Sequence, residues 1–393
     1  MAYQPGRHFL QLPGPTNTPL AVLQAMAKPV IDHRGPEFAA LGLEVLASIK
    51  TIFKTEQPVI IYPTSGSGAW EAALVNVLSP GDRVLMYETG HFSGLWGKIA
   101  TRLGLEPEII PGDWRSGVDA AAIGARLAED KGHAIKAVAV VHNETSTGVL
   151  SDVAAVRRAI DAAGHPALLL VDCVSSLGAV DYRHDEWGVD VSISGSQKGL
   201  MLPPGIAFNA ISQKARAASK TARLARSYWD WEDMLAFNGK GFFPYTPNTN
   251  LLQGLKVGIE LLHAEGLDQV FTRHAKAGEA TRRAVRAWGL ELQCRVESQH
   301  SSILTAVRMP EGHSADKLRG EILARYNMSL GSGLSQLADK VFRIGHLGDF
   351  HDLITTGTLA GVEMGLKVAG VPHRPGGVAA AMDYIAGAAA PVT

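Results

Sequence analysis

Between about residues 58 and 212, short apolar runs alternate with segments of helical spacing, and this alternation is the feature that most restricts the fold. Runs typical of strands are PVIIY, RVLMYE, IKAVAVVH, ALLLVDC, VDVSISG and IAFNAIS. The segments between them repeat apolar residues every three or four positions, and one ends at Gly164, a typical helix stop. Because right-handed crossovers place helices on both faces of a sheet, we expect an α/β fold with a buried, mainly parallel sheet.

After Ser212 the pattern changes to long helices with few strands. Helices are predicted near 213–225, 249–264, 267–288, 314–326 and 350–369, and strands in SSILTAVRM and VFRIG. This mixture is typical of a smaller α+β domain. We therefore expect an N-terminal segment (1–16), a large domain (17–258) and a small C-terminal domain (259–393), with the linker inside the helix near 249–264.

The composition excludes several classes of protein. Lys plus Arg number 37 and Asp plus Glu number 38, so the net charge of −1 gives no strong attraction to nucleic acid or anionic lipid. No apolar run is long enough to span a bilayer, and the first residues contain no apolar signal core. The two cysteines, Cys173 and Cys294, lie far apart, which excludes a disulfide framework and a cysteine-rich metal site. We expect a soluble cytoplasmic protein without a metal.

Asp172 and Lys198 form the first candidate site. Asp172 ends the run ALLLVDC, and Lys198 follows VDVSISG in the segment SGSQKGLMLPPG. Both fall at the carboxyl edge of the expected sheet, where open α/β sheets bind ligands. A lysine with a facing aspartate suits pyridoxal phosphate (PLP), with Lys198 as the Schiff-base residue and Asp172 on the ring nitrogen. A structural ion pair beside a Gly- and Pro-rich turn is the alternative.

The segment PTSGSGAWEAALVNVL provides a candidate phosphate site. Residues 65–68 are Ser-Gly-Ser-Gly, between an expected strand and an expected helix. Small residues there let an anion reach the free N–H groups of the helix start. The segment has neither the lysine of a Walker A loop nor a GxGxxG pattern, which disfavours nucleotides. A tight strand-to-helix turn is the alternative.

Three further features could belong to the same site. Trp96, in the next crossover, could stack on a flat cofactor or be simply core. Thr145 and Ser146, in HNETSTGVL, could bind the cofactor or cap the helix that begins near Ser151. Arg343, inside the apolar strand VFRIG, requires a partner, which is either a substrate carboxylate or an internal acid.

Together these segments resemble the fold type I PLP enzymes, and among them the class V aminotransferases that use glyoxylate with serine or alanine. The blocks that carry the resemblance, from one end of the chain to the other, are PGPTN, DHRGPEF, SGSGAWEAALVN, HNETSTGVLSD, LLLVDCVSSLGAVD, SGSQKGLMLPPG, FPYTP and KVFRIGHLGD. The resemblance implies a PLP-dependent transaminase acting on small amino acids and 2-oxo acids, and it makes 17–258 the PLP-binding domain.

The resemblance also implies roles for single residues. Lys198 would bind PLP covalently, Asp172 would pair with the ring nitrogen, and Arg343 would hold the substrate α-carboxylate. The remaining contacts to the cofactor would be made by Ser67, Gly68 and Gln197 around the phosphate, Ala69 nearby, Thr145 on the ring hydroxyl and Trp96 on the ring face. FPYTP would reach the cofactor of a second subunit through Thr246 and Tyr245, which implies a homodimer with shared active sites. Whether dimers pair into tetramers stays open.

Two points of the resemblance bear on the substrate. Ala69 stands where the vertebrate alanine–glyoxylate enzymes carry a histidine, so ring coverage would depend mainly on Trp96. The blocks DHRGPEF, HNET, YWDWED and FRIGHLGD are most similar to the serine–glyoxylate enzymes, which predicts the conversion of L-serine and glyoxylate to hydroxypyruvate and glycine. Alanine–glyoxylate and aspartate–glyoxylate aminotransferases are the alternatives. A cysteine desulfurase is disfavoured, because neither Cys173 nor Cys294 lies in a segment expected to be a mobile loop.

Overall fold

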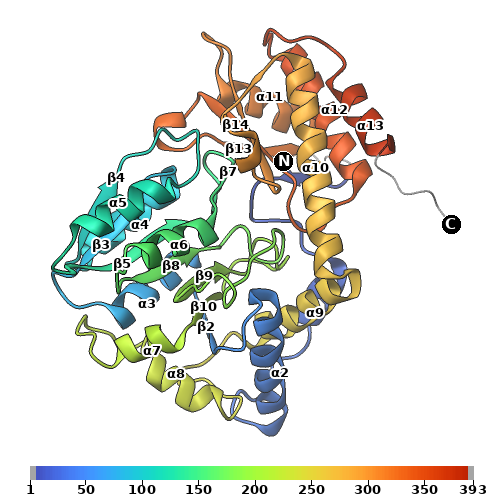
Figure 1. Ribbon diagram of the computed structural model, residues 1–393. Helices are drawn as coiled ribbons and strands as arrows, with labels where there is room; N and C mark the ends of the chain where they lie inside the picture. Colours follow the sequence, from blue (N-terminus) through green and yellow to red (C-terminus); the bar gives the residue numbers. More distant parts are fainter. Residues whose placement is uncertain (1–5, 388–393) are drawn as a thin grey trace.

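The apolar runs between residues 58 and 212 form one seven-stranded sheet in the computed structural model, which describes residues 6–387 (Figure 1). The strand order is β2-β10-β9-β8-β5-β3-β4. The strands are β2 (Val59–Tyr62), β3 (Arg83–Tyr87), β4 (Glu106–Ile110), β5 (Ile135–Val141), β8 (Leu168–Asp172), β9 (Val191–Gly195) and β10 (Ala207–Ile211). All neighbours pair in parallel except at β10, which is antiparallel to both β2 and β9. The prediction of a mainly parallel sheet is confirmed.

Helices cover both faces of this sheet, because alternate side chains of each strand point to opposite faces and both sets are apolar. In β8, Leu169 and Val171 pack into one core, whereas Leu168 and Leu170 pack into the other. The first core is completed by α2 (Pro36–Phe53), α5 (Ala120–Glu129), α6 (Val153–Ala162) and α9 (Thr249–Glu265). The second is completed by α3 (Gly66–Val77), α4 (His91–Arg102), α7 (Gln213–Ser219) and α8 (Trp231–Asn238).

A smaller sheet of order β1-β13-β14-β12-β11 lies beside the large one. Its strands are β1 (Phe9–Gln11), β11 (Glu291–Leu292), β12 (Leu304–Arg308), β13 (Met328–Ser332) and β14 (Val341–Gly345). Figure 1 shows α10 (Leu267–Trp288) running from α9 into this part, which also contains α11 (Ala315–Tyr326), α12 (Asp352–Val368) and α13 (Gly377–Gly387). Although β1 is the first strand along the chain, it pairs in parallel with β13, so residues Phe9–Gln11 of the N-terminal segment belong to the small sheet.

Short elements complete the chain. They are α1 (Leu20–Met26), the hairpin β6 (Asn143–Glu144) and β7 (Val149–Leu150), and the 3₁₀ turns η1 (Glu297–Gln299) and η2 (Ser335–Leu337). Among the described residues, no helix is both long and apolar enough to cross a membrane.

The structure differs from the expected elements in several places, two of them in or beside the large sheet. The segment 213–225 is helical only as far as Ser219, and a separate helix, α8, begins at Trp231. The edge strand β4 was not expected, since its sequence EPEII is half-exposed and includes a proline. Between α9 and α10 the chain turns at Gly266, whose φ of +85° suits glycine. Core packing of the large sheet continues through α9 as far as Val270.

Candidate active site

Loops that leave the carboxyl ends of the parallel strands surround one cavity, which we call the lysine cavity. Its lining consists of Ser65, Gly66, Ser67, Trp70, Phe92, Asn143, Thr145, Asp172, Val174, Ser175, Gln197 and Lys198. The residues expected from the sequence that line it are Ser67, Thr145, Asp172, Gln197 and Lys198. Asp172 ends β8, and Lys198 follows the neighbouring strand β9, so strand order alone brings the carboxyl group and the amine together.

The Lys198 amine is held at the bottom of this cavity by the N-terminal segment. Its Nζ donates a hydrogen bond of 2.6 Å to the carbonyl oxygen of Pro13. Gly14 follows, with a φ of +100° that suits glycine, and a Cβ there would lie 2.4 Å from Nζ and force the amine to move. Burial and the nearby positive charge of Arg343 lower the pKa of Lys198 to about 8, against the opposing effect of Asp172. A neutral amine, able to accept a proton, is therefore accessible near neutral pH.

Both oxygens of the Asp172 carboxyl group are held by donors. Oδ1 accepts the backbone N–H of Val174 at 2.7 Å, and Oδ2 accepts the indole N–H of Trp70 at 3.1 Å. Burial raises the pKa of Asp172 to about 7, and Glu144 adds to the rise, whereas both donors and Lys198 lower it. The group is thus poised to exchange a proton or to pair with a cationic partner.

The cofactor contacts that the resemblance implied at Gly68 and Ala69 lie one or two residues too far along the chain. Ser67 lines the cavity together with Ser65 and Gly66, whereas Gly68 and Ala69 do not line it, and Ala69 is fully buried. The helix α3 begins at Gly66, and the side chain of its N-cap residue Ser65 makes no capping hydrogen bond. The N–H groups of the first turn therefore remain available to an anion. The expectation that Gly68 and Ala69 contact the cofactor is not supported by this placement.

The aromatic residue expected over the cofactor was also misplaced. Trp96 is fully buried and does not line the cavity; it lies behind Trp70, with ring centroids 5.8 Å apart and planes 15° apart. Phe92 lines the cavity instead. It lies in the first turn of α4, next to the sheet edge, and Trp96 lies one turn further away. The predicted stacking of Trp96 is therefore wrong, and Phe92 is the ring available for it.

Glu144, for which sequence analysis predicted no role, holds the backbone at Phe92 in place. Its carboxylate is fully buried and accepts the backbone N–H groups of Phe92 and Ser93, at 3.2 Å each, at the start of α4. It also accepts the hydroxyl of Ser146 at 2.6 Å. A carboxylate at a helix N-terminus interacts favourably with the helix dipole. Glu144 thereby joins the hairpin that carries Thr145 to the helix that carries Phe92.

Arg343 is buried beside Thr145 and bonded to backbone carbonyl oxygens. Its Nη1 donates to the carbonyl oxygen of Thr145 at 2.8 Å, and its Nε donates to the carbonyl oxygen of Ser332 at 2.7 Å. Burial lowers its pKa to about 10. Among the described residues, no carboxylate lies within ion-pair distance of it, although Glu144 is near enough to act on its pKa. The internal ion pair that was the alternative for Arg343 is absent there, which favours an external carboxylate.

Tyr245 and Thr246 lie outside the lysine cavity. They line a second hollow, which we call the aromatic cavity, together with Ile61, Tyr62, Pro63, Ile206, Tyr228, Met234, Phe243, Pro247, Asn248 and Leu252. The ring of Tyr245 is stacked on that of Tyr228, with centroids 4.4 Å apart. A single chain therefore does not bring Thr246 to its own Lys198.

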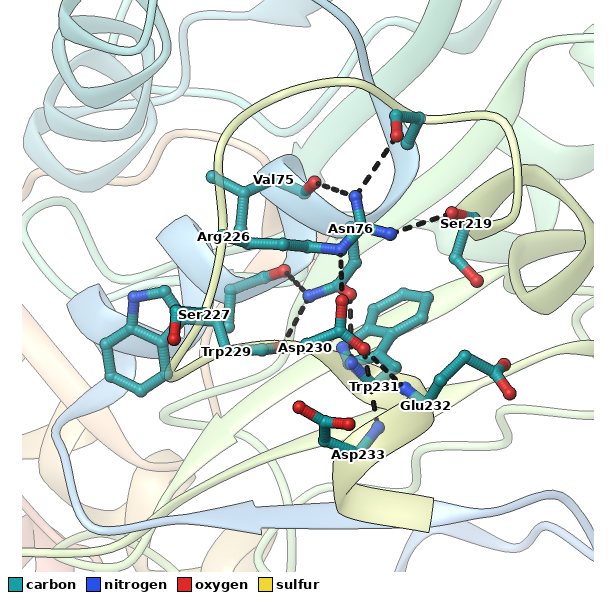
Figure 2. Close-up of polar contacts among 12 residues, drawn as sticks. Val75, Asn76, Ser219, Arg226, Ser227, Trp229, Asp230, Trp231, Glu232 and Asp233 are labelled. Carbon is teal, nitrogen blue, oxygen red and sulfur yellow. Dashed lines mark hydrogen bonds and ion pairs between the residues drawn. The ribbon is translucent and has the colours of Figure 1, made fainter. Parts of the chain in front are cut away.

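A polar network anchors this aromatic segment to α3 (Figure 2). Arg226 donates to Asp230 at 2.9 Å and to the carbonyl oxygens of Val75 and Ser219. Asn76 donates to the carbonyl oxygen of Trp229 and accepts the N–H of Trp231. The helix that begins at the candidate phosphate site thus also positions the segment that carries Tyr228.

The lysine cavity fits PLP in three respects. It offers a buried amine for the aldehyde, a buried carboxyl group for the ring nitrogen, and an uncapped helix start for the phosphate. Gln197 adds a buried Oε1 that has no hydrogen-bond partner among the described residues. When bound, the cofactor would supply a ring that withdraws electrons from the substrate Cα. Lys198, Asp172 and the Ser65–Ser67 turn are the groups that would hold it.

Comparison with known proteins agrees with this geometry. The family model described as aminotransferase class-V matches residues 8–342. The chain belongs to the class-V aminotransferases. It is 49% identical to the serine–glyoxylate aminotransferase of Methylorubrum extorquens over 389 residues, covering 97% of each chain. It is 46% identical to that of Arabidopsis thaliana, covering 98% of this chain and 96% of the other.

Solved structures show the same fold for this class-V aminotransferase. The alanine–glyoxylate aminotransferase of Nostoc is 30% identical, with a TM-score of 0.86 over 93% of this chain and 97% of that one. The pyridoxamine–pyruvate aminotransferase of Mesorhizobium loti is 28% identical, with a TM-score of 0.89 over 99% and 100%. The fold is that of the fold type I PLP enzymes, and the protein is a PLP-dependent transaminase, which confirms the predicted fold class and cofactor.

Proposed function

We propose that this class-V aminotransferase transfers the amino group of L-serine to glyoxylate, giving hydroxypyruvate and glycine. One observation carries the transaminase chemistry, namely a buried amine and a buried carboxyl group that face one cavity from neighbouring strands. The choice of serine is supported by full-length relatives named serine–glyoxylate aminotransferase, at 46–49% identity.

Lys198 is proposed to move the proton in both half-reactions. In the first half-reaction its free amine takes the proton from Cα of the amino donor. In the second it gives a proton to the carbon of glyoxylate that becomes Cα of glycine. A group whose pKa is about 8 is roughly one-tenth neutral at pH 7, so part of the enzyme holds the base in its active form. The carbonyl oxygen of Pro13 and the space left by Gly14 set the direction of the amine.

Arg343 is proposed to orient each substrate through its α-carboxylate. The guanidinium is fixed by two backbone carbonyls, and it lies beside the hairpin residue Thr145 of the lysine cavity. Because every amino and 2-oxo acid carries this carboxylate, Arg343 fixes orientation without selecting the side chain. Selection must arise from the other side chains around the cavity.

Aspartate is the rival donor. The L-aspartate–glyoxylate aminotransferase of Paracoccus denitrificans is 46% identical over 95% of each chain. A β-carboxylate calls for a second cation besides Arg343, and the lining of the lysine cavity offers none other than Lys198, which is proposed to move the proton. We therefore propose that serine is preferred over alanine, and alanine over aspartate.

Mixing the PLP-loaded enzyme with one donor at a time, without any 2-oxo acid, isolates the first half-reaction. The loss of cofactor absorbance is expected to show the highest second-order rate constant with serine. A higher constant with aspartate would overturn the serine assignment and leave the transaminase chemistry intact.

A desulfurase reaction is disfavoured by both thiols. Cys173 and Cys294 are buried, and burial raises the pKa of each. A nucleophilic cysteine needs the opposite, namely an exposed thiol with a lowered pKa. The solved cysteine desulfurase of Thermococcus onnurineus is 19% identical and shares the fold. Treatment of the folded enzyme with a thiol-alkylating reagent is expected to leave turnover unchanged.

We also propose that the active unit is a homodimer in which Thr246 and Tyr245 reach the partner's cofactor phosphate. The proposal is supported by their position in the aromatic cavity, apart from Lys198 of the same chain. Two free thiols suit a reducing compartment, and we propose the cytoplasm.

A further inference from the structure

Trp70 lies between the helix that begins at the phosphate site and the carboxyl group of Asp172. It is only 2% exposed, lines the lysine cavity, and follows Gly66, the first residue of α3, by about one turn. Its Nε1 donates to Asp172 Oδ2 at 3.1 Å. Trp70 is thus the side chain that connects the expected phosphate anchor to the expected partner of the ring nitrogen.

A second tryptophan beside it provides an internal comparison. Trp96 is stacked on Trp70 and is fully buried as well, but its Nε1 has no hydrogen-bond partner among the described residues. Both indoles are buried and packed against each other, and only that of Trp70 lines the cavity and donates to a carboxylate. A hydrogen bond to a charged group is stronger than one between neutral groups.

The hydrogen bond acts on a carboxyl group that burial would otherwise keep protonated. Burial and Glu144 raise the pKa of Asp172, whereas the N–H groups of Val174 and Trp70 and the charge of Lys198 lower it. A protonated Asp172 would accept the N–H of a protonated ring nitrogen much more weakly than the carboxylate does. Because Val174 and Trp70 bind different oxygens, together they also restrict rotation of the carboxylate plane.

We propose that Trp70 is a positioning residue for the reaction, whose indole N–H keeps the Asp172 carboxylate anionic and oriented toward the ring nitrogen of the cofactor. The inference rests on PLP as the cofactor but not on the identity of the amino donor. It predicts an effect of the indole N–H that is separate from the packing of the indole ring.

The test compares Trp70→Phe with Trp96→Phe in the full-length protein freed of cofactor. Affinity is measured by equilibrium dialysis for PLP and for an analogue in which a C–H group replaces the ring nitrogen. Trp70→Phe is expected to weaken PLP binding about tenfold, the scale of one charge-assisted hydrogen bond. For the analogue, the loss of affinity in Trp70→Phe is expected to exceed the loss in Trp96→Phe by less than about twofold.

Equal losses for PLP and the analogue would overturn the proposal, as would equal losses in the two variants, because both results indicate packing alone. Unchanged PLP binding in Trp70→Phe would overturn it as well. Should Trp70→Phe not fold, benzothienylalanine incorporated at position 70 keeps the shape of indole and replaces the N–H by sulfur. The same comparisons and outcomes then apply.

A pH series gives an independent readout. Lys198 and Glu144 also act on Asp172, but both are unchanged in the two variants. Without the indole N–H, the pH below which PLP affinity declines is expected to move upward in Trp70→Phe and to stay in place in Trp96→Phe. At saturating PLP, kcat should fall about tenfold in Trp70→Phe with less than a twofold change in KM. A changed KM with unchanged kcat, or no displacement of the pH profile, would contradict the assignment.

Discussion

The lysine cavity and the aromatic cavity lie at the same edge of the large sheet but differ in chemistry. The lysine cavity contains an amine and a carboxyl group whose pKa values, about 8 and about 7, are both displaced toward neutrality. The aromatic cavity has no acidic or basic side chain in its lining, and it is built from tyrosines and apolar residues. Proton transfer is therefore confined to the first cavity, and the second can contribute only shape and hydrogen bonds.

The largest effect is expected from removing the amine of the lysine cavity. Lys198→Ala should lower turnover by at least about a thousandfold, because the group that binds the aldehyde and moves the proton is gone. Non-covalent binding of PLP should persist, since the turn at Ser65–Ser67 is untouched. Steady-state assays and dialysis measure the two quantities. Turnover within tenfold of the parent enzyme would show that another base is in use.

Asp172→Asn should lower kcat by about a hundredfold with PLP fully bound. The amide cannot stabilise a proton on the ring nitrogen, and each pKa unit lost there costs about 1.4 kcal/mol. Stopped-flow measurement of the first half-reaction, at saturating donor, tests it. Near-normal kcat would refute the role.

The same variant should be more stable than the parent when both are free of cofactor. Burial raises the pKa of Asp172 to about 7 in the folded state, against about 4 in the unfolded chain. Its contribution to the free energy of unfolding is therefore complete below about pH 4 and is lost as the pH rises through about 7, where the buried group ionises. At pH 8 the Asn variant avoids this cost, and we expect a gain of about 1–3 kcal/mol. Urea unfolding at pH 4 and pH 8 measures the difference, which should shrink at the lower pH.

Arg343→Ala should lower kcat/KM at least about tenfold with both serine and glyoxylate. Truncating one partner of a buried charge pair costs about 2–5 kcal/mol, and about 1.4 kcal/mol corresponds to tenfold. Arg325→Ala is a matched control, because Arg325 is an exposed guanidinium of α11 that pairs with Glu321. A loss confined to one of the two substrates would show that Arg343 does not hold the shared carboxylate.

The smallest effect is expected in the aromatic cavity. Thr246→Val should weaken PLP binding by a few-fold, because the variant loses one hydrogen bond to the phosphate. Thr246→Ser keeps the hydroxyl and should restore the affinity. If the hydroxyl acts across a dimer, dilution of the parent enzyme should also release PLP. A monomer that keeps PLP and full activity would contradict the proposal that Thr246 completes the active site of a partner subunit.

The sequence predicted the sheet and the meeting of Asp172 and Lys198 at one cavity well, because both follow from short-range patterns. Apolar runs define the central strands, and residues at strand ends meet at one edge whatever the loop conformations are. The edge strand β4 was missed because a half-exposed strand with a proline lacks such a run.

The errors at the site have a common cause in helix position. The SGSG motif contains two Ser-Gly pairs, and only the first coincides with the start of α3. Phe92 and Trp96 are four residues apart on one face of α4, so periodicity does not distinguish them. The signal that could have separated them is distance from the preceding strand, because the first turn of the helix lies nearest the sheet edge. Glu144 and Trp70 act through tertiary hydrogen bonds that no sequence spacing reveals.

The central claim is that Lys198 is the residue that binds the cofactor, at the cavity it shares with Asp172. Reduction of the PLP-loaded enzyme with borohydride, followed by peptide mass spectrometry, tests it directly. A single pyridoxyl phosphate adduct on Lys198 is predicted, with no adduct in Lys198→Ala. An adduct on any other lysine of the parent enzyme would contradict the account.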